Sequence, residues 1–178
     1  MHAVRFVVAL AVIAIGLCTS PALATDARVA LPGGGAWVLP APAGWRQTEQ
    51  AGPGPTLSLT PQSGNAFQIL VSPLVRAGNP MPSTSPEFVR RITQSGADSA
   101  RAQSVEPSLP LQELRSANVL GSYFSATDKA PKPGEYKYMT QGALAVQGLV
   151  VTFTILSNDG AKPAVEAALG MLKDARRE

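Results

Sequence analysis

The chain has 178 residues, of which 45% are hydrophobic and 15% are charged, and its formal net charge is +3 at pH 7. This length suits one ordinary domain with a buried core. The small charge argues against a nucleic-acid-binding surface and against strong attraction to acidic lipids. The sequence holds a single histidine, His2, and a single cysteine, Cys18, both close to its start.

Residues 1–24 have the pattern of a secretory signal peptide. Arg5 supplies a positive charge, residues 6–17 form an uncharged apolar run, and the small residues Ala22 and Ala24 follow a proline. The apolar run is shorter than the roughly 20 residues that a membrane-spanning helix needs. We therefore expect cleavage after Ala24 and release of the remaining chain into a bacterial periplasm or the medium.

An alternative is that the leader belongs to a lipoprotein subunit, with Cys18 acylated and the protein held on a membrane. Leu17 argues against this alternative, because a small residue is expected directly before an acylated cysteine. Replacing Cys18 with serine and following membrane retention would distinguish the two.

Cleavage would leave a chain with neither thiol nor imidazole. Nucleophilic catalysis of the Ser-His-Asp or Cys-His type needs an imidazole, and zinc, copper and haem sites lose their commonest ligands. Loss of Arg5 leaves 14 basic and 12 acidic residues, a net charge of +2. The sequence therefore predicts no cofactor, no metal, no nucleic-acid partner and no membrane span after cleavage.

The first half of the remaining chain predicts two β-hairpins. Short strands at 28–31 and 36–39 flank a proline and three glycines, which favour a turn. Residues 56–60 alternate between polar and apolar, and they pair with a strand at 66–72 across a polar turn.

A helix is predicted to begin after Ser85. Ser85 is a suitable N-cap, Pro86 suits the first helical position, and Glu87 places a negative charge near the positive end of the helix dipole. Apolar side chains follow at helical spacing, and the helix is expected to fade between Gly96 and Arg101.

The second half predicts a further group of strands and a final helix. A weak strand within 109–120 and a stronger one at 121–127 precede a charged loop. Strands at 136–146 and 148–156 form a hairpin with its turn at Gln147–Gly148. The last helix extends to Arg177 and carries an apolar stripe of Val165, Ala168, Leu169 and Leu172.

Strands joined by short turns are antiparallel neighbours, and each helix needs a sheet face to cover its apolar stripe. The order strands, helix, strands, helix therefore predicts a single α+β domain over residues 25–178. We expect an antiparallel β-sheet packed with two main helices, an α/β/α-type sandwich.

The chain resembles the PsbP-like α/β/α sandwich family of small exported bacterial proteins. The resemblance rests on Pro42–Trp45, the strand at 67–71, the helix start at Ser85–Phe88, and the closing strand 150–156 with its following helix. It implies a non-catalytic binding or accessory role, as in the extrinsic photosystem subunit that names the family. It carries over no ligand residues.

Aromatic side chains are the candidates for a ligand or partner surface. Trp37 lies in a glycine- and proline-rich segment, and Tyr136 and Tyr138 share one face of a predicted strand. If that strand is at a sheet edge, the two tyrosines could form a recognition surface; cross-strand packing is the simpler alternative. For Trp45 we expect an anchor that packs the N-terminal segment onto the core.

Asp128 and Glu135 bracket one charged loop and form the alternative acid/base pair. Such a pair could serve a carboxylate-dependent hydrolase acting on cell-envelope material. Two acids at the ends of a loop more often only solvate it. The sequence therefore favours an exported, non-catalytic accessory or binding protein, with the hydrolase and the lipoprotein subunit as alternatives. The partner, an envelope protein or a small ligand, is left open.

Overall fold

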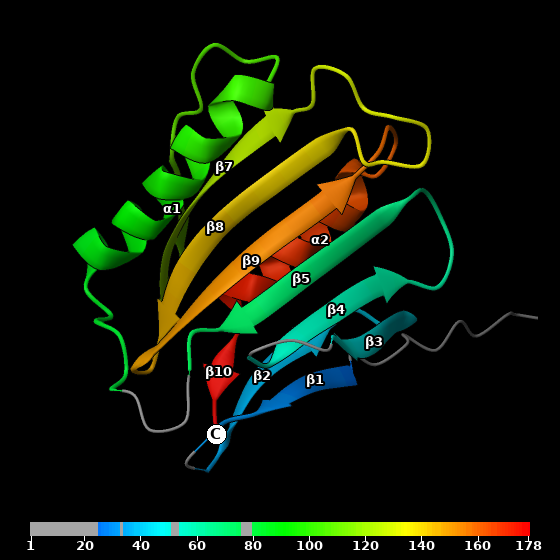
Figure 1. Cartoon of the computed structure of the whole chain (residues 1–178). Helices are drawn as coiled ribbons and strands as arrows, with labels where there is room; N and C mark the ends of the chain where they lie inside the picture. Colours follow the sequence, from blue (N-terminus) through cyan, green and yellow to red (C-terminus); the bar gives the residue numbers. More distant parts are fainter. Residues whose placement is uncertain (1–24, 33, 51–53, 76–79) are drawn as a thin grey trace, which may run out of the picture.

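The computed structural model describes residues 25–32, 34–50, 54–75 and 80–178 (Figure 1). Within these ranges the chain forms two helices and ten strands, and every strand pair is antiparallel. The α+β prediction is therefore confirmed. Residues 1–24, which the sequence predicts to be a signal peptide and which include His2, Cys18, Ala22 and Ala24, lie outside the described residues, so cleavage and acylation stay predictions.

The larger sheet has seven strands in the order β3-β4-β5-β9-β8-β7-β6 (Figure 1). Five pairings between consecutive strands and one pairing between β5 and β9 build it, so strands from both halves of the chain lie side by side. The strands are β3 (Trp45–Gln50), β4 (Thr56–Pro61), β5 (Phe67–Pro73), β6 (Gln112–Arg115), β7 (Val119–Thr127), β8 (Tyr138–Val146) and β9 (Leu149–Ser157).

Alternation of side chains between the two sheet faces explains why these segments are strands. In β5 and β9 the buried residues Ile69, Val71, Phe153 and Ile155 point to one face, and less buried residues point to the other. The β8–β9 turn forms as predicted at Gln147–Gly148, where both residues have positive φ angles of 45° and 79°. Such angles are typical of the two-residue turns that match the twist of a hairpin.

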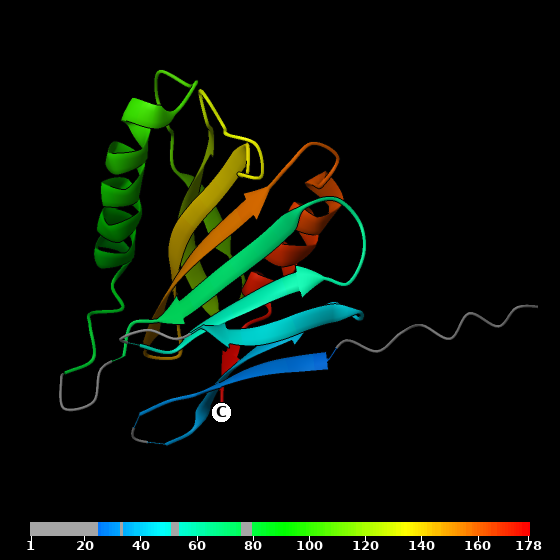
Figure 2. The same cartoon turned by 45° about the vertical axis from the view of Figure 1, so that its right-hand side comes forward.

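Helix α1 (Pro86–Ala100) covers one face of the sheet over β7 and β8 (Figure 2). It begins as predicted, because the Ser85 Oγ accepts a hydrogen bond from the Phe88 amide at 3.2 Å. On its buried side, Thr93 Oγ1 donates to the Ser122 carbonyl of β7 at 3.1 Å. A short 3₁₀ turn, η1 (Arg101–Gln103), follows the helix.

The opposite face is covered by helix α2 (Lys162–Lys173) and by a small sheet of order β1-β2-β10 (Figure 2). The small sheet consists of β1 (Thr25–Ala30), β2 (Ala36–Ala41) and β10 (Arg176–Arg177). The two helices thus lie on opposite faces of the larger sheet, which places the main core between that sheet, α2 and β2.

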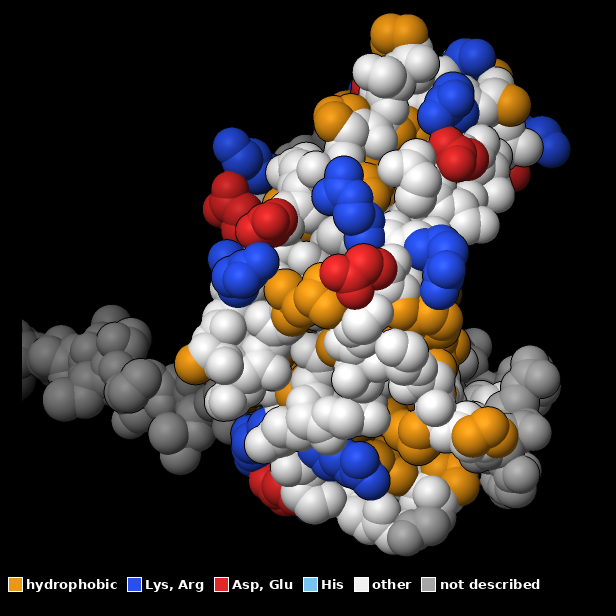
Figure 3. All heavy atoms as spheres, turned by 90° about the vertical axis from the view of Figure 1, so that its left-hand side faces the viewer, with side chains coloured by type: hydrophobic (Ala, Val, Ile, Leu, Met, Phe, Trp, Pro, Cys, Tyr) orange, Lys and Arg blue, Asp and Glu red, His pale blue; other side chains and the backbone are white. Residues whose placement is uncertain are grey.

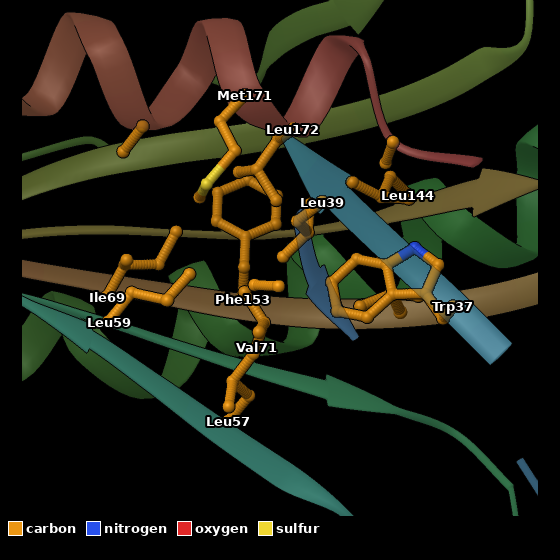
Figure 4. Close-up of a cluster of buried hydrophobic side chains, with 14 of the residues drawn as sticks. Trp37, Leu39, Leu57, Leu59, Ile69, Val71, Leu144, Phe153, Met171 and Leu172 are labelled. Atoms are coloured by element: carbon orange, nitrogen blue, oxygen red, sulfur yellow. The ribbon is translucent and has the colours of Figure 1, made fainter. Parts of the chain in front are cut away.

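The main core joins segments that are far apart in the sequence. Trp37 and Leu39 of β2, Leu57 of β4, Phe153 of β9 and Leu172 of α2 are all buried in one cluster (Figure 4). The same cluster extends to residues of β1 and to the segment after α2. Burial of this continuous apolar surface is the main stabilising contribution to the fold.

The C-terminal segment corrects the predicted extent of the last helix. Helix α2 ends at Lys173, and Arg176–Arg177 instead pairs with Trp37 and Val38 of β2. The Glu178 amide also donates to the Ala36 carbonyl at 2.8 Å. The helical preference of arginine is weak enough for this strand pairing to override it.

Strand β3 was missed by the sequence prediction. Its residues, WRQTEQ, are almost all exposed, so no apolar alternation marks it. The segment becomes a strand through its backbone pairing with β4 at the edge of the sheet.

Charges of both signs are interspersed on the side of the molecule shown in Figure 3. The exposed face of α1 carries Glu87, Arg90, Arg91 and Asp98, and Arg101 after the helix pairs with Asp98 at 2.7 Å. On this face, positive and negative side chains therefore lie among one another. Within the described residues, neither helix is long and apolar enough to cross a membrane.

Candidate functional site

A cluster of Lys137, Tyr138 and Asp159 lies at the end of the sheet where β8 begins and β9 has just ended (Figure 1). The Tyr138 hydroxyl donates to Asp159 Oδ1 at 2.6 Å, and the Lys137 ammonium lies 3.2 Å from both Asp159 oxygens. The same ammonium lies 5.0 Å from the centre of the Tyr138 ring. These contacts link the three side chains to one another.

Two cavities flank Tyr138, one toward each helix. The cavity toward the end of α1 has a volume of about 150 Å³ and includes Tyr136, Met139 and Leu156 in its lining. The cavity at the start of α2 has a volume of about 340 Å³, and its lining is Tyr138, Thr140, Ser157, Asn158, Asp159, Gly160, Lys162 and Val165. The larger volume is in the range of pockets that hold small ligands.

Both charged members of the cluster are held in their ionised forms. Hydrogen bonds from the Tyr138 hydroxyl and the Lys137 ammonium lower the pKa of Asp159. Interaction with the side chains of Tyr138 and Asp159 raises the pKa of Lys137. The cluster therefore offers fixed donors and acceptors, which suits recognition of a ligand more than proton transfer at neutral pH.

The structure places the two predicted tyrosines beside one cavity but not on one strand. Tyr136 and Tyr138 are both half-buried and both line the smaller cavity. However, β8 lies between β7 and β9, so the edge-strand surface considered for them does not exist. Strand β8 begins only at Tyr138, and Tyr136 belongs to the preceding loop.

The prediction that Trp37 contributes to a ligand surface is wrong. Its side chain extends from β2 into the main core and is fully buried, among the largest enclosed side chains (Figure 4). Its indole Nε1 has no hydrogen-bond partner among the described residues. The packing predicted for Trp45 is confirmed, because its ring meets the Phe67 ring edge-on at 5.1 Å between centroids.

The structure does not bring Asp128 and Glu135 to one cavity. Asp128 Oδ1 accepts a hydrogen bond from the Ala130 amide at 2.8 Å, and Glu135 Oε2 accepts one from the Lys132 amide at 2.9 Å. Asp128 lines the smaller cavity, whereas Glu135 is exposed and lines neither cavity beside Tyr138. Each carboxylate stabilises its own turn in the loop.

Glu106 is a carboxylate that the sequence analysis did not single out. It accepts hydrogen bonds from the Thr127 amide at 2.9 Å, the Thr127 hydroxyl at 2.7 Å and the Ser104 hydroxyl. It thereby ties the segment after α1 to the end of β7, beside the smaller cavity. Its partner Thr127 is 21 residues away in the chain, so no local pattern could have revealed the contact.

We expect Glu106→Gln to destabilise the protein by about 1–2 kcal/mol at neutral pH, measured by urea unfolding. Burial alone would raise the pKa of Glu106, but the hydrogen bonds from Ser104 and Thr127 outweigh it and lower the pKa from 4.5 to about 2. Because the folded-state pKa is depressed, this contribution is present above pH 4.5 and is lost as the pH falls toward 2.

The Glu106→Gln variant should therefore lose less stability than the wild type over that acidic range. Glu113→Gln is the control, since Glu113 is exposed and its ion pair with the exposed Arg115, at 3.5 Å, contributes little to stability. Equal acid sensitivity of the wild type and Glu106→Gln would contradict the prediction.

Among the described residues there is no group of three or more His, Cys, Asp and Glu side chains placed to hold a metal ion. Comparisons of the chain with family models, with curated proteins and with solved structures found no match. The site is therefore interpreted from its own geometry.

Proposed function

We propose that this protein is an exported binding protein of the bacterial cell envelope that recognises a ligand without catalysing a reaction. The observation that carries the proposal is the ordered Lys137–Tyr138–Asp159 cluster between two cavities. Fixed donors and acceptors beside an aromatic ring are the usual means of orienting a ligand in a pocket.

Export is supported by the leader pattern of residues 1–24 alone. If cleavage follows Ala24, the exported chain contains no histidine and no cysteine. The commonest nucleophiles and general bases would then be absent, which favours binding over catalysis.

The hydrolase alternative has less support than binding, because Asp128 and Glu135 each stabilise a separate turn. The PsbP-like resemblance would imply the same accessory role as the proposal. The α+β fold is compatible with that resemblance and does not test it.

A ligand screen tests the proposed function. The protein exported by cells expressing the full sequence is purified and screened by thermal shift against envelope-derived small molecules. We expect at least one compound to raise the unfolding midpoint of the wild type and to raise it less in Tyr138→Phe, which lacks the hydroxyl that bonds to Asp159.

Tyr123→Phe is the matched control, since it removes a tyrosine hydroxyl that donates to Gln112 at 3.0 Å and lines neither cavity. Turnover of a cell-envelope substrate by the purified protein, abolished by Asp128→Asn or Glu135→Gln, would overturn the proposal. Mass spectrometry of the purified chain, with Cys18→Ser beside it, shows whether the leader is cleaved after Ala24 or acylated.

A further inference from the structure

The larger cavity beside Tyr138 has a lining suited to one class of ligand. It is bounded by the first turn of α2, by the last residue of β9 and by Tyr138. Its volume of about 340 Å³ exceeds that of a single ion, and Val165 and the Tyr138 ring supply apolar walls. The cavity therefore has room for a small organic molecule with a polar end.

Ser157 is the unexplained polar group of this cavity. The residue is only 5% exposed, and no hydrogen bond links its hydroxyl to any other described residue. In the described part of the chain, Trp37 Nε1 is the one fully enclosed side-chain polar atom without a partner. The Ser157 hydroxyl must then reach the cavity, where it is free to donate to a ligand. Because the residue is otherwise buried, its hydroxyl can find a hydrogen-bond partner only in the cavity, either water or a ligand.

The start of α2 adds further donors. The Ala161 amide donates to the Asn158 carbonyl before the helix, and the Ala164 and Val165 amides donate to the Ala161 carbonyl. No described carbonyl accepts from the amides of Gly160 and Lys162. The helix has no side-chain cap and no acidic residue in its first turn. Unpaired amides and the positive end of the helix dipole favour a negatively charged group at this position.

The charges around the cavity leave one cation available. The Asp159 carboxylate at the rim is already ion-paired with Lys137 and accepts a hydrogen bond from the Tyr138 hydroxyl. The Lys162 ammonium is 3.9 Å from Glu166, and the two side chains are 87% and 66% exposed. A pair so exposed contributes little, so the Lys162 side chain is free to turn toward a ligand.

We propose that this cavity binds a small molecule through an oxyanion, a phosphate or carboxylate group, held by the Ser157 hydroxyl, the Lys162 ammonium and the free amides of Gly160 and Lys162 at the start of α2. The inference rests on the proposed binding function and names the ligand class of its larger cavity. The organic part of the ligand would lie against Val165 and the Tyr138 ring.

Titration of the exported, purified protein with inorganic phosphate and with acetate, followed by backbone amide NMR, tests the proposal. We expect saturable shifts that are centred on residues 157–165. Ser157→Ala and Lys162→Gln should each weaken phosphate binding by about tenfold, the usual consequence of removing one hydrogen bond to a charged group. Neither substitution should lower the unfolding midpoint without phosphate. The Ser157 hydroxyl has no hydrogen-bond partner to lose among the described residues, and Lys162 lies at the end of the helix dipole that is unfavourable for a cation.

Lys173→Gln is the matched control, because it removes the same charge from the other end of α2. Its phosphate affinity should equal that of the wild type. If Lys173→Gln and Lys162→Gln lost the same phosphate affinity, the binding would be explained by general charge attraction, and the proposal would be overturned.

A vesicle arm distinguishes the two sources of a phosphate group. Co-sedimentation with phosphatidylglycerol vesicles that is lost in Ser157→Ala would support a lipid headgroup, and phosphate binding without co-sedimentation would support a soluble ligand. If neither phosphate nor acetate produced localised amide shifts, the inference of an oxyanion site would be overturned.

The proposed binding function would still stand in that case if a neutral compound stabilised the wild type more than it stabilised Tyr138→Phe.

Discussion

Replacing Trp37 with alanine is expected to destabilise the protein by about 4 kcal/mol, the largest effect of any single aromatic truncation in this chain. The side chain is fully buried and contacts the cluster that joins β2, β9 and α2 (Figure 4). Its removal would leave a cavity in a region fixed by three elements, which limits how far the surroundings can collapse. Urea unfolding followed by circular dichroism measures the loss.

Trp45→Ala is the matched control, because it deletes the same side chain from a half-buried position at the sheet edge. At that position the Trp45 ring packs edge-on against the Phe67 ring. We expect its removal to lower the free energy of unfolding by about 1–2 kcal/mol. A loss for Trp45→Ala as large as that for Trp37→Ala would contradict the assignment of Trp37 to the core.

Replacing Gly142 with alanine is expected to cost about 3 kcal/mol, although it adds only one methyl group. Gly142 lies in β8, directly opposite Phe153 of β9 and Tyr123 of β7. An added Cβ would lie 2.9 Å from the Phe153 ring and 2.8 Å from the Tyr123 Cβ, and it would also meet the Ser122 carbonyl. The added methyl group is blocked by the backbone of β7 and by side chains of both β7 and β9. Neither of these strands can therefore move away without disturbing the sheet.

Gly170→Ala makes the same change in α2, where an added Cβ meets no atom within 4 Å. It should stabilise the protein by about 0.5–1 kcal/mol, since alanine has a higher helix propensity than glycine. Thermal unfolding of the two variants should therefore shift in opposite directions. Shifts of the same sign would refute the close packing of β8 between its neighbours.

The strands and the first helix could be predicted because their signals are local. The alternating residues 56–60, the hairpin turn at Gln147–Gly148 and the Ser85 cap each depend on neighbours in the chain. Strand β3 and strand β10 could not be predicted in this way. Strand β3 forms by pairing with the next strand, β4, and β10 by pairing with the distant β2. Neither strand carries an apolar pattern of its own.

The candidate site shows the same division. Tyr138 was identified from the sequence, but its partner Asp159 is 21 residues away, and the wrong aromatic residue, Trp37, was grouped with it. Only the register of β8 against β9 brings Tyr138 opposite Ser157 and beside the start of α2. Residue type alone does not distinguish a buried tryptophan from an exposed one.

The sequence by itself determined the α+β class, the antiparallel hairpins and the position of α1, because these follow from periodicity, turn residues and capping within short segments. It also carries the leader pattern and confines its single histidine and cysteine to that leader. Only the tertiary structure decided which side chains are buried, which carboxylates share a cavity and where two cavities open beside Tyr138. Those features depend on contacts between residues far apart in the chain, and no local pattern encodes such contacts.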